Sequence, residues 1–81
     1  MARVTLFGSL APFTDGVLKL DLEVSNVRQL FQVLGERYPE LRAHLEAGFA
    51  VAIDGEIYQD ALLQPIARDS EVILIPKIAG G

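Results

Sequence analysis

The chain ends in two adjacent glycines, Gly80 and Gly81, and this pair is the part of the sequence with the clearest chemical use. Because glycine has no Cβ, an extended glycine pair can pass through a narrow channel and present its terminal carboxylate to a partner's active site. That carboxylate is ionised at neutral pH and is a poor electrophile. Acyl transfer at Gly81 therefore requires prior activation, for example as a mixed anhydride with AMP. The alternative interpretation is a frayed chain end without a role.

The conventional catalytic and metal-binding arrangements are missing from the sequence. The chain has no cysteine, which excludes disulfides and thiolate metal sites. His44 is the single histidine and has no evident co-ligand, so we interpret it as a solvated or structural residue. The acidic residues show no spacing that sets one acid–base pair apart. No glycine-rich loop leads from a strand into a helix, as phosphate binding would require. We therefore expect no bound metal or cofactor.

Length and charge narrow the remaining classes of function. The chain has 81 residues, 51% of them hydrophobic, which predicts one packed domain over residues 1–81 with residues 77–81 as a flexible tail. The net charge of −4 is spread along the chain without a basic patch, which argues against nucleic acid as a partner. No apolar segment approaches the ~20 residues that span a bilayer, and no signal peptide is evident. We expect a cytoplasmic protein that does not bind membranes.

Two strands are predicted ahead of the first helix, over residues 3–10 and 17–24. The second has a clear period of two: Leu18, Leu20, Leu22 and Val24 face one way, whereas Lys19, Asp21 and Glu23 face the other. Turn-forming residues between the two strands predict a hairpin: Pro12, Asp15 and Gly16.

A helix is predicted over residues 27–38. Asn26 can cap its free N–H groups, and Gln29 stands three residues later, as in a capping box. Pro39 cannot continue the helix comfortably, and Gly35 permits close packing against it. One apolar stripe follows helical spacing and predicts that Leu30, Phe31 and Leu34 are in the core: Val27, Leu30, Phe31, Leu34 and Tyr38.

The second half of the chain reads as further strands. A partial turn over residues 41–45 precedes a strand over 49–53, and Asp54-Gly55 predicts a tight hairpin to a short strand over 56–58. An irregular connection over 60–67 leads to a central strand over 72–75. One amphipathic helix packed across one face of a small mixed sheet is an α+β, ubiquitin-like β-grasp fold.

The whole chain resembles the MoaD/ThiS family of β-grasp sulfur carriers, most of all its MoaD branch, the small subunits of molybdopterin synthase. The resemblance rests on short segments along the chain and above all on the tail: Leu6-Phe7-Gly8, Asn26-Val27-Arg28-Gln29-Leu30, Tyr38-Pro39-Glu40-Leu41, Val51-Ala52-Ile53-Asp54-Gly55, Asp69-Ser70-Glu71-Val72 and Ile75-Pro76-Lys77-Ile78-Ala79-Gly80-Gly81. One departure lies at Lys77, where the family commonly has a second proline.

The resemblance implies a mechanism centred on Gly81. An ATP-dependent activating enzyme adenylates its carboxylate, and a sulfur donor displaces AMP to leave a thiocarboxylate. ATP is thus used by the partner, and the only group attached to this chain is the covalent sulfur on Gly81. The tail then enters the large subunit of molybdopterin synthase and delivers sulfur to a pterin precursor. Gly80 provides steric clearance, and the carrier alone turns nothing over.

A docking surface is expected on the outer face of the sheet. If Val4 and Leu6 point inward, Phe7 points away from the helix. We place Ile73 and Ile75 on the same face, so that the three form an apolar patch leading towards the tail. The alternative is that loops cover Phe7 and it only completes the core. The resemblance extends the partner-binding residues through the tail: Pro76, Lys77, Ile78 and Ala79.

Two other interpretations stay open. The thiocarboxylate can serve thiazole synthesis or tRNA thiolation instead, or the tail can form isopeptide bonds as ubiquitin-like modifiers do. Alternatively, the chain is a non-catalytic β-grasp interaction module with an inert tail, whose binding survives loss of Gly80 and Gly81.

Overall fold

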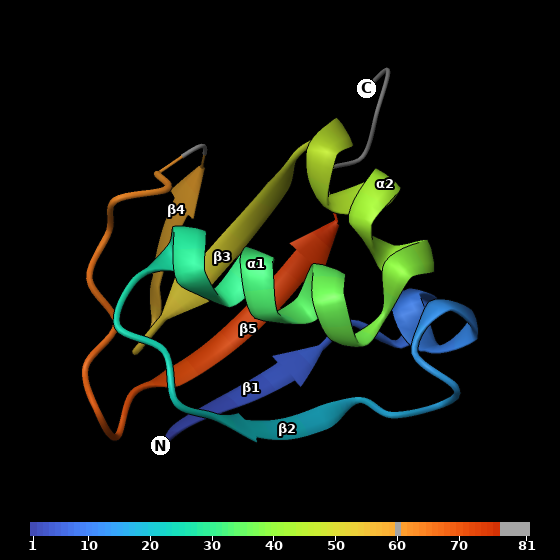
Figure 1. Ribbon diagram of the computed structural model, residues 1–81. Coiled ribbons are helices and arrows are strands. Elements are labelled where there is room, and N and C mark those ends of the chain that lie inside the picture. The colour runs from blue at the N-terminus through green and yellow to red at the C-terminus, as the bar shows by residue number, and fades with distance from the viewer. Residues whose placement is uncertain (60, 77–81) are drawn as a thin grey trace.

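The computed structural model describes residues 1–59 and 61–76, and it confirms the β-grasp arrangement (Figure 1). Five strands form one sheet in the order β2-β1-β5-β3-β4. The central pair, β1 and β5, is parallel, and the other neighbours are antiparallel. The strands are β1 (Ala2–Leu6), β2 (Lys19–Leu22), β3 (Phe49–Ile53), β4 (Glu56–Gln59) and β5 (Glu71–Pro76).

The helix α1 (Val27–Arg37) crosses one face of the sheet and closes the core (Figure 1). Its cap is as predicted, because the Asn26 Oδ1 accepts a hydrogen bond from the Gln29 N–H at 2.8 Å. The Gln29 side chain reaches back one residue further than a capping box requires, and its Oε1 accepts from the Ser25 N–H at 2.6 Å.

The apolar stripe of α1 meets the sheet, with one correction to the predicted core. Leu30 and Leu34 are completely buried, as expected. Phe31 is only half-buried, because it lies at the border of the helix–sheet contact. There its ring packs edge-to-face against Phe49, with 6.3 Å between the ring centroids.

A second helix, α2 (Pro39–Ala47), replaces the partial turn that we expected over residues 41–45. Pro39 occupies its first turn, where the missing N–H costs nothing. Leu41 and Leu45 are one helical turn apart and both buried, so packing against the core extends the turn into a helix. Gly35 allows this approach, since a Cβ there would meet the Arg42 side chain at 3.1 Å.

The first strand is shorter than predicted. β1 ends at Leu6, and residues Gly8–Phe13 form a 3₁₀ helix, η1. The turn begins where the Leu10 N–H donates to the Phe7 carbonyl at 2.9 Å, and it buries Leu10 against the core. Pro12 within this segment has no N–H to donate to a β-ladder. The hairpin of β1 and β2 is nonetheless present, with Val4 opposite Leu20.

The remaining strands follow the predicted order. Asp54 and Gly55 adopt positive φ values of 49° and 90° and form the tight turn between β3 and β4. β5 lies between β1 and β3 and is therefore the central strand, as its apolar sequence indicated. Burial follows a period of two in β1 and β5, so that Val4, Leu6, Val72 and Leu74 face α1.

Candidate functional site

The strand β5 carries the chain from the middle of the sheet to the predicted functional tail. Its last residue, Pro76, pairs with Phe49 at the start of β3. Because β1 runs parallel to β5, the end of β1 and the start of η1 lie at this same end of the sheet (Figure 1). Residues Lys77, Ile78, Ala79, Gly80 and Gly81, which we predicted to form the tail, lie outside the described residues.

Phe7 stands next to this end of β5 with its side chain on the outer face. Its N–H donates to the Leu74 carbonyl at 3.2 Å, one step beyond the pairing of Leu6 with Leu74. Its side chain is 49% exposed, which contradicts the alternative that loops cover it. A large exposed aromatic residue on a sheet face is typical of a surface that a partner covers.

In β5, Ile73 and Ile75 lie on the outer face of the sheet, as we predicted. Ile73 is 41% exposed and Ile75 is half-buried, whereas Val72 and Leu74 are completely buried on the helix side. Ile73 lies opposite Thr5 of β1 on one side and Ala52 of β3 on the other. Ile73 and Ile75 therefore place two apolar side chains of β5 on the outer face of the sheet.

The structure adds Ile57, which the sequence reasoning missed. Ile57 of β4 pairs with Ala52, so Ile57 and Ile73 flank the same small alanine on the outer face. It is the more exposed of the two isoleucines, at 64%. The sequence contained a signal for it, because a two-residue Asp54-Gly55 turn places Ile57 opposite Ala52. We call Phe7, Ile57, Ile73 and Ile75 the docking patch.

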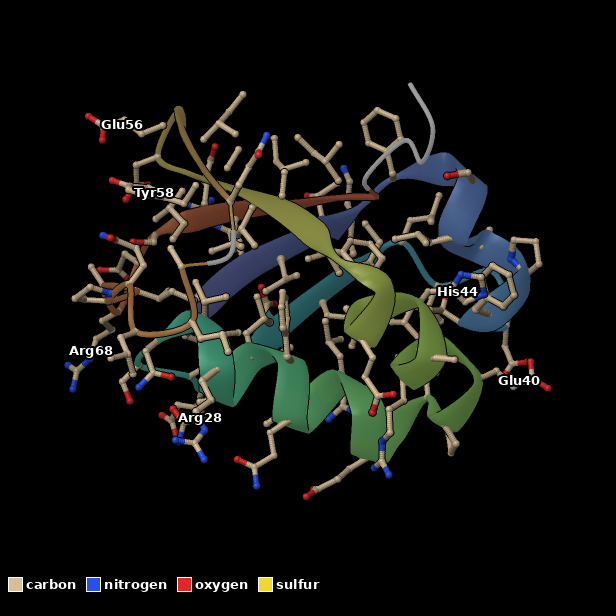
Figure 2. The ribbon with its side chains drawn as sticks, turned by 90° about the horizontal axis from the view of Figure 1, so that it is seen from above. Arg28, Glu40, His44, Glu56, Tyr58 and Arg68 are labelled. Atoms are coloured by element: carbon tan, nitrogen blue, oxygen red, sulfur yellow. The ribbon has the colours of Figure 1, made fainter. Side chains whose placement is uncertain are left out.

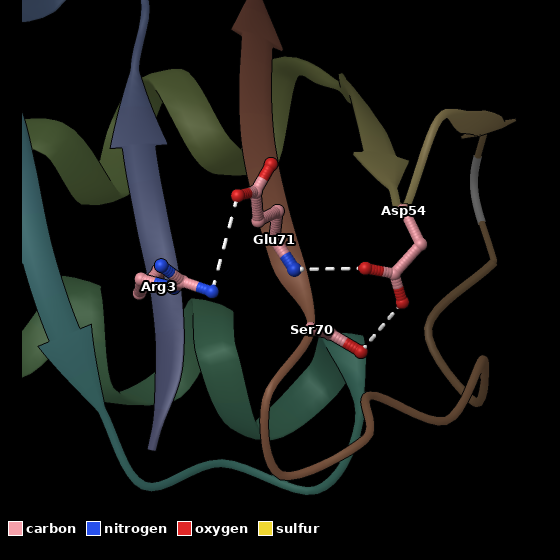
Figure 3. A network of polar contacts seen from close by, with 4 residues as sticks. All are labelled: Arg3, Asp54, Ser70 and Glu71. Carbon is pink, nitrogen blue, oxygen red and sulfur yellow. Dashed lines mark hydrogen bonds and ion pairs between the residues drawn. The ribbon is translucent and has the colours of Figure 1, made fainter.

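Charged residues border the docking patch at the end of the sheet away from Pro76. Arg3 pairs with Asp21 of β2 and with Glu71 of β5 in the strand register. The Arg3 Nη2 lies 3.9 Å from the Glu71 Oε1, and both side chains are largely exposed (Figure 3). Such a pair adds little to stability, so its position suits a polar rim around an apolar surface.

Asp54 fixes the neighbouring corner of the sheet by a set of hydrogen bonds (Figure 3). Its Oδ1 accepts from the Glu71 N–H at 3.0 Å, and its Oδ2 accepts from the Ser70 hydroxyl at 2.8 Å. The Glu71 N–H, followed by the Ser70 hydroxyl, holds the pKa of the Asp54 carboxyl below its usual value. Since every contact joins β3 to the start of β5, this carboxylate positions a strand and is not poised for acid–base chemistry.

We interpreted His44 as a solvated or structural residue, and the structure gives it one aromatic contact. It lies exposed on α2 (Figure 2). Its ring stacks obliquely on Phe13 of η1, with 4.1 Å between the ring centroids. Within residues 1–59 and 61–76, no three histidine or carboxylate side chains converge on a possible metal position. In the same part of the chain, no helix is both long enough and apolar enough to cross a bilayer.

Comparison with known structures confirms the fold at low sequence identity. CysO from Mycobacterium tuberculosis superposes with a TM-score of 0.80 and 16% identity, covering 96% of this chain and 100% of that one. Small archaeal modifier protein 1 from Methanosarcina acetivorans gives 0.78 and 20%, covering 99% and 95%. A chain from the complex of subunits 1 and 2 of the Helicobacter pylori molybdopterin-converting factor gives 0.68 and 22%, covering 99% and 97%.

Sequence comparison identifies the family. None of the curated protein sequences is significantly similar to this chain. The ThiS family matches residues 4–81, a range that includes the docking patch and both C-terminal glycines. The chain therefore belongs to the ThiS family, the ubiquitin-like β-grasp sulfur carriers.

Proposed function

We propose that this protein is a sulfur carrier whose C-terminal carboxylate, at Gly81, is converted to a thiocarboxylate. The observation that carries the proposal is the family match, which continues through Gly80 and Gly81 to the end of the chain. In the first step a carboxylate oxygen attacks the α-phosphorus of ATP on an activating enzyme, and pyrophosphate leaves. In the second step sulfide attacks the carbonyl carbon, AMP leaves as the bond to its oxygen breaks, and loss of the sulfur-bound proton gives the thiocarboxylate.

The docking patch supports this role, because a carrier must hold its partners while its tail reaches their active sites. Phe7 and Ile73 are large, apolar and exposed on the same sheet face. Ile73 lies on β5, and Phe7 directly follows the parallel strand β1, at the end of the sheet where β5 ends. A few residues buried near the centre of an interface supply most of its affinity, and exposed apolar side chains of this size can fill that place.

For the acceptor, we propose molybdopterin synthesis, with the large subunit of molybdopterin synthase as the partner. Two likenesses support this proposal. The tail resembles that of the MoaD branch, and the fold superposes on a chain from a molybdopterin-converting factor complex. Sulfur transfer to a thiazole or to tRNA is the alternative within the same chemistry.

A second candidate is protein modification, in which the activated Gly81 carbonyl forms an isopeptide bond with a lysine. The specific observation in its favour is the superposition on small archaeal modifier protein 1. The chain has only two lysines of its own, Lys19 and Lys77, so chains of linked copies are not favoured.

Intact-mass measurement tests the chemistry directly. The protein is incubated with ATP, the activating enzyme of the same organism and a sulfide source. We expect a gain of about 16 Da, because sulfur replaces one carboxylate oxygen. A variant lacking Gly81 is the control and should not change in mass. If the full chain keeps its mass while the activating enzyme consumes no ATP, the carrier proposal is wrong. Conjugates with other proteins in place of the thiocarboxylate would favour the modifier.

A further inference from the structure

A groove opens on the helix side of the sheet, between α1, the second half of α2 and the inner face of β3 and β4. Its volume is about 580 Å³, a size typical of small-molecule sites. Phe49 and Val51, which line it, face α1, so the groove lies on the opposite side of the sheet from the docking patch. It is therefore separate from the surface assigned to the carrier's partners.

The floor of the groove is aromatic and only partly covered by the chain itself. Phe31 of α1 and Phe49 of β3 meet there edge-to-face. Phe31 and Tyr58 are both half-buried, although they pack against the core. Leu45 of α2 closes the floor at the far end. Phe49 is itself buried, at 3% exposure, so a flat or chain-like apolar group laid on this floor would chiefly cover Phe31 and Tyr58.

One wall of the groove is held in place by backbone hydrogen bonds from the start of α1. The Arg28 N–H donates to the Leu62 carbonyl at 2.8 Å, and the Val27 N–H donates to the Gln64 carbonyl at 3.1 Å. These bonds fix Leu62 beside the groove while leaving its side chain 46% exposed. The adjacent Leu63 is 78% exposed and does not line the groove.

The charges on the rim differ between the two ends. At the Leu62 end, the rim carries the guanidinium of Arg28, which projects from the first turn of α1 (Figure 2). Among the described residues, no carboxylate forms an ion pair with it. At the α2 end, two carboxylates, Glu36 and Glu46, accompany one guanidinium, that of Arg42. An anion is therefore favoured at Arg28 and disfavoured at the other end.

The other polar groups of the groove are already engaged. The Arg42 Nη2 donates to the Gly35 carbonyl at 3.3 Å, which ties this guanidinium to α1. The Tyr58 hydroxyl donates to the Glu56 Oε2 at 2.7 Å, and this hydrogen bond raises the pKa of Tyr58. These bonds leave Arg28 as the rim cation best placed to accept an anionic ligand group.

We propose that this groove binds a small amphipathic organic anion, with its apolar body on Phe31 and Tyr58 and its carboxylate or sulfonate at Arg28. The inference goes beyond sulfur transfer, because neither the docking patch nor Gly81 takes part. It gives the carrier a second site that stays open while a partner covers the outer face of the sheet.

The test uses the full chain and two probes of this class, anilinonaphthalene sulfonate and decanoate. We expect the fluorescence of the bound sulfonate dye to saturate with its concentration. Decanoate should displace the dye, and decanol, which lacks the charge, should displace it less well. Amide NMR spectra of the same samples should show the largest shifts at Phe31, Tyr58 and Leu62. They also establish that the chain is folded, since this dye binds partly folded chains as well.

Two matched pairs of variants separate the groove from the rest of the surface. Arg28→Gln should weaken binding of both anions by about five- to tenfold, through loss of one charge-assisted contact. Arg37→Gln, on the same helix but outside the groove, should leave the affinity for both anions unchanged. Leu62→Ser should weaken binding by a similar factor, whereas Leu63→Ser should not.

Several results would overturn the proposal. Equal affinity in both members of each pair would show that the dye binds elsewhere. Shifts centred on Phe7 and Ile73 would place it on the docking patch. Shifts of groove residues that grow with protein concentration without a probe would mean that a second copy occupies the groove. Each outcome is independent of sulfur loading, which the mass measurement tests separately.

Discussion

The two faces of β5 have nearly the same composition but different roles. Val72 and Leu74 point towards α1 and are completely buried, whereas Ile73, between them, is 41% exposed on the outer face. The end of β1 shows the same contrast, with Leu6 buried and Phe7, the next residue, exposed. Hydrophobicity alone therefore does not identify the core of this sheet. The inner residues stabilise the fold, and the outer ones are available to bind a partner.

The strongest test of this contrast compares neighbours in β5. Leu74→Ala should lower the free energy of unfolding by about 2–5 kcal/mol, because it leaves a cavity between the sheet and α1. Leu34→Ala, on the facing surface of α1, should have a similar effect. Ile73→Ala should cost about 1 kcal/mol or less, because its side chain already meets water. Urea denaturation of the three variants measures the difference, and equal losses for Leu74 and Ile73 would contradict it.

The binding role of the outer face is tested by Phe7→Ala. We expect weaker binding to the activating enzyme or the large subunit, by about 1–3 kcal/mol, with only a modest loss of stability. Calorimetric titration measures the affinity, and thermal unfolding measures the stability. Leu63→Ala removes an exposed apolar side chain outside the patch and should leave the affinity unchanged. Unaltered binding by a folded Phe7→Ala variant would eliminate the docking role.

The cap of α1 holds the helix over the inner face, and its removal should have a smaller effect. Asn26→Ala loses the hydrogen bond from the Gln29 N–H and should destabilise the protein by about 1 kcal/mol. Asn26→Ser keeps an acceptor at this position and should recover most of the loss. Thermal unfolding of both variants measures the effect. If the alanine and serine variants are equally stable, the capping bond is not what matters at Asn26.

The smallest expected effect concerns the register that assigns residues to the two faces. Asp54 bonds to Ser70 and Glu71 at the start of β5, and a slip of one residue there would exchange inner and outer side chains. Because the pKa of Asp54 lies below its ordinary value of 3.8, its ionised form favours the folded state. This contribution is complete above that ordinary pKa and is lost as the pH falls through the lowered pKa.

Asp54→Ala should therefore lower the melting temperature at pH 7, and the difference from the unchanged protein should shrink in strong acid. Asp15→Ala is a matched control, because Asp15 also adopts a positive φ, of 54°. Among the described residues, the Asp15 carboxylate accepts no hydrogen bond, so this variant measures the effect of alanine at a positive φ without the loss of such bonds. A gap between the Asp54 variant and the unchanged protein that stays constant with pH would show that the carboxylate charge is not responsible.

Local chemistry made much of the fold predictable. The cap at Asn26, the Asp54-Gly55 turn and the alternation from Leu18 to Val24 each depend on residues close together in the chain. The same holds for the functional hypothesis at Gly80 and Gly81, which rests on the chemistry of two adjacent glycines. Such signals can be read from the sequence because residues close together in the chain bond to the backbone N–H and C=O groups or restrict the backbone dihedral angles.

Contacts between distant segments decided the rest. Leu41 and Leu45 become a helical face only when η1 and the core are present to bury them, so α2 exceeds the predicted turn. The run from Val72 to Ile75 is apolar at every position, and its phase depends on which side α1 covers. The place of Ile57 in the docking patch, and the groove beside Phe31, likewise depend on how α1 lies across the sheet. The sequence specifies which side chains are hydrophobic, but the segments that pack against them determine which of these side chains are buried.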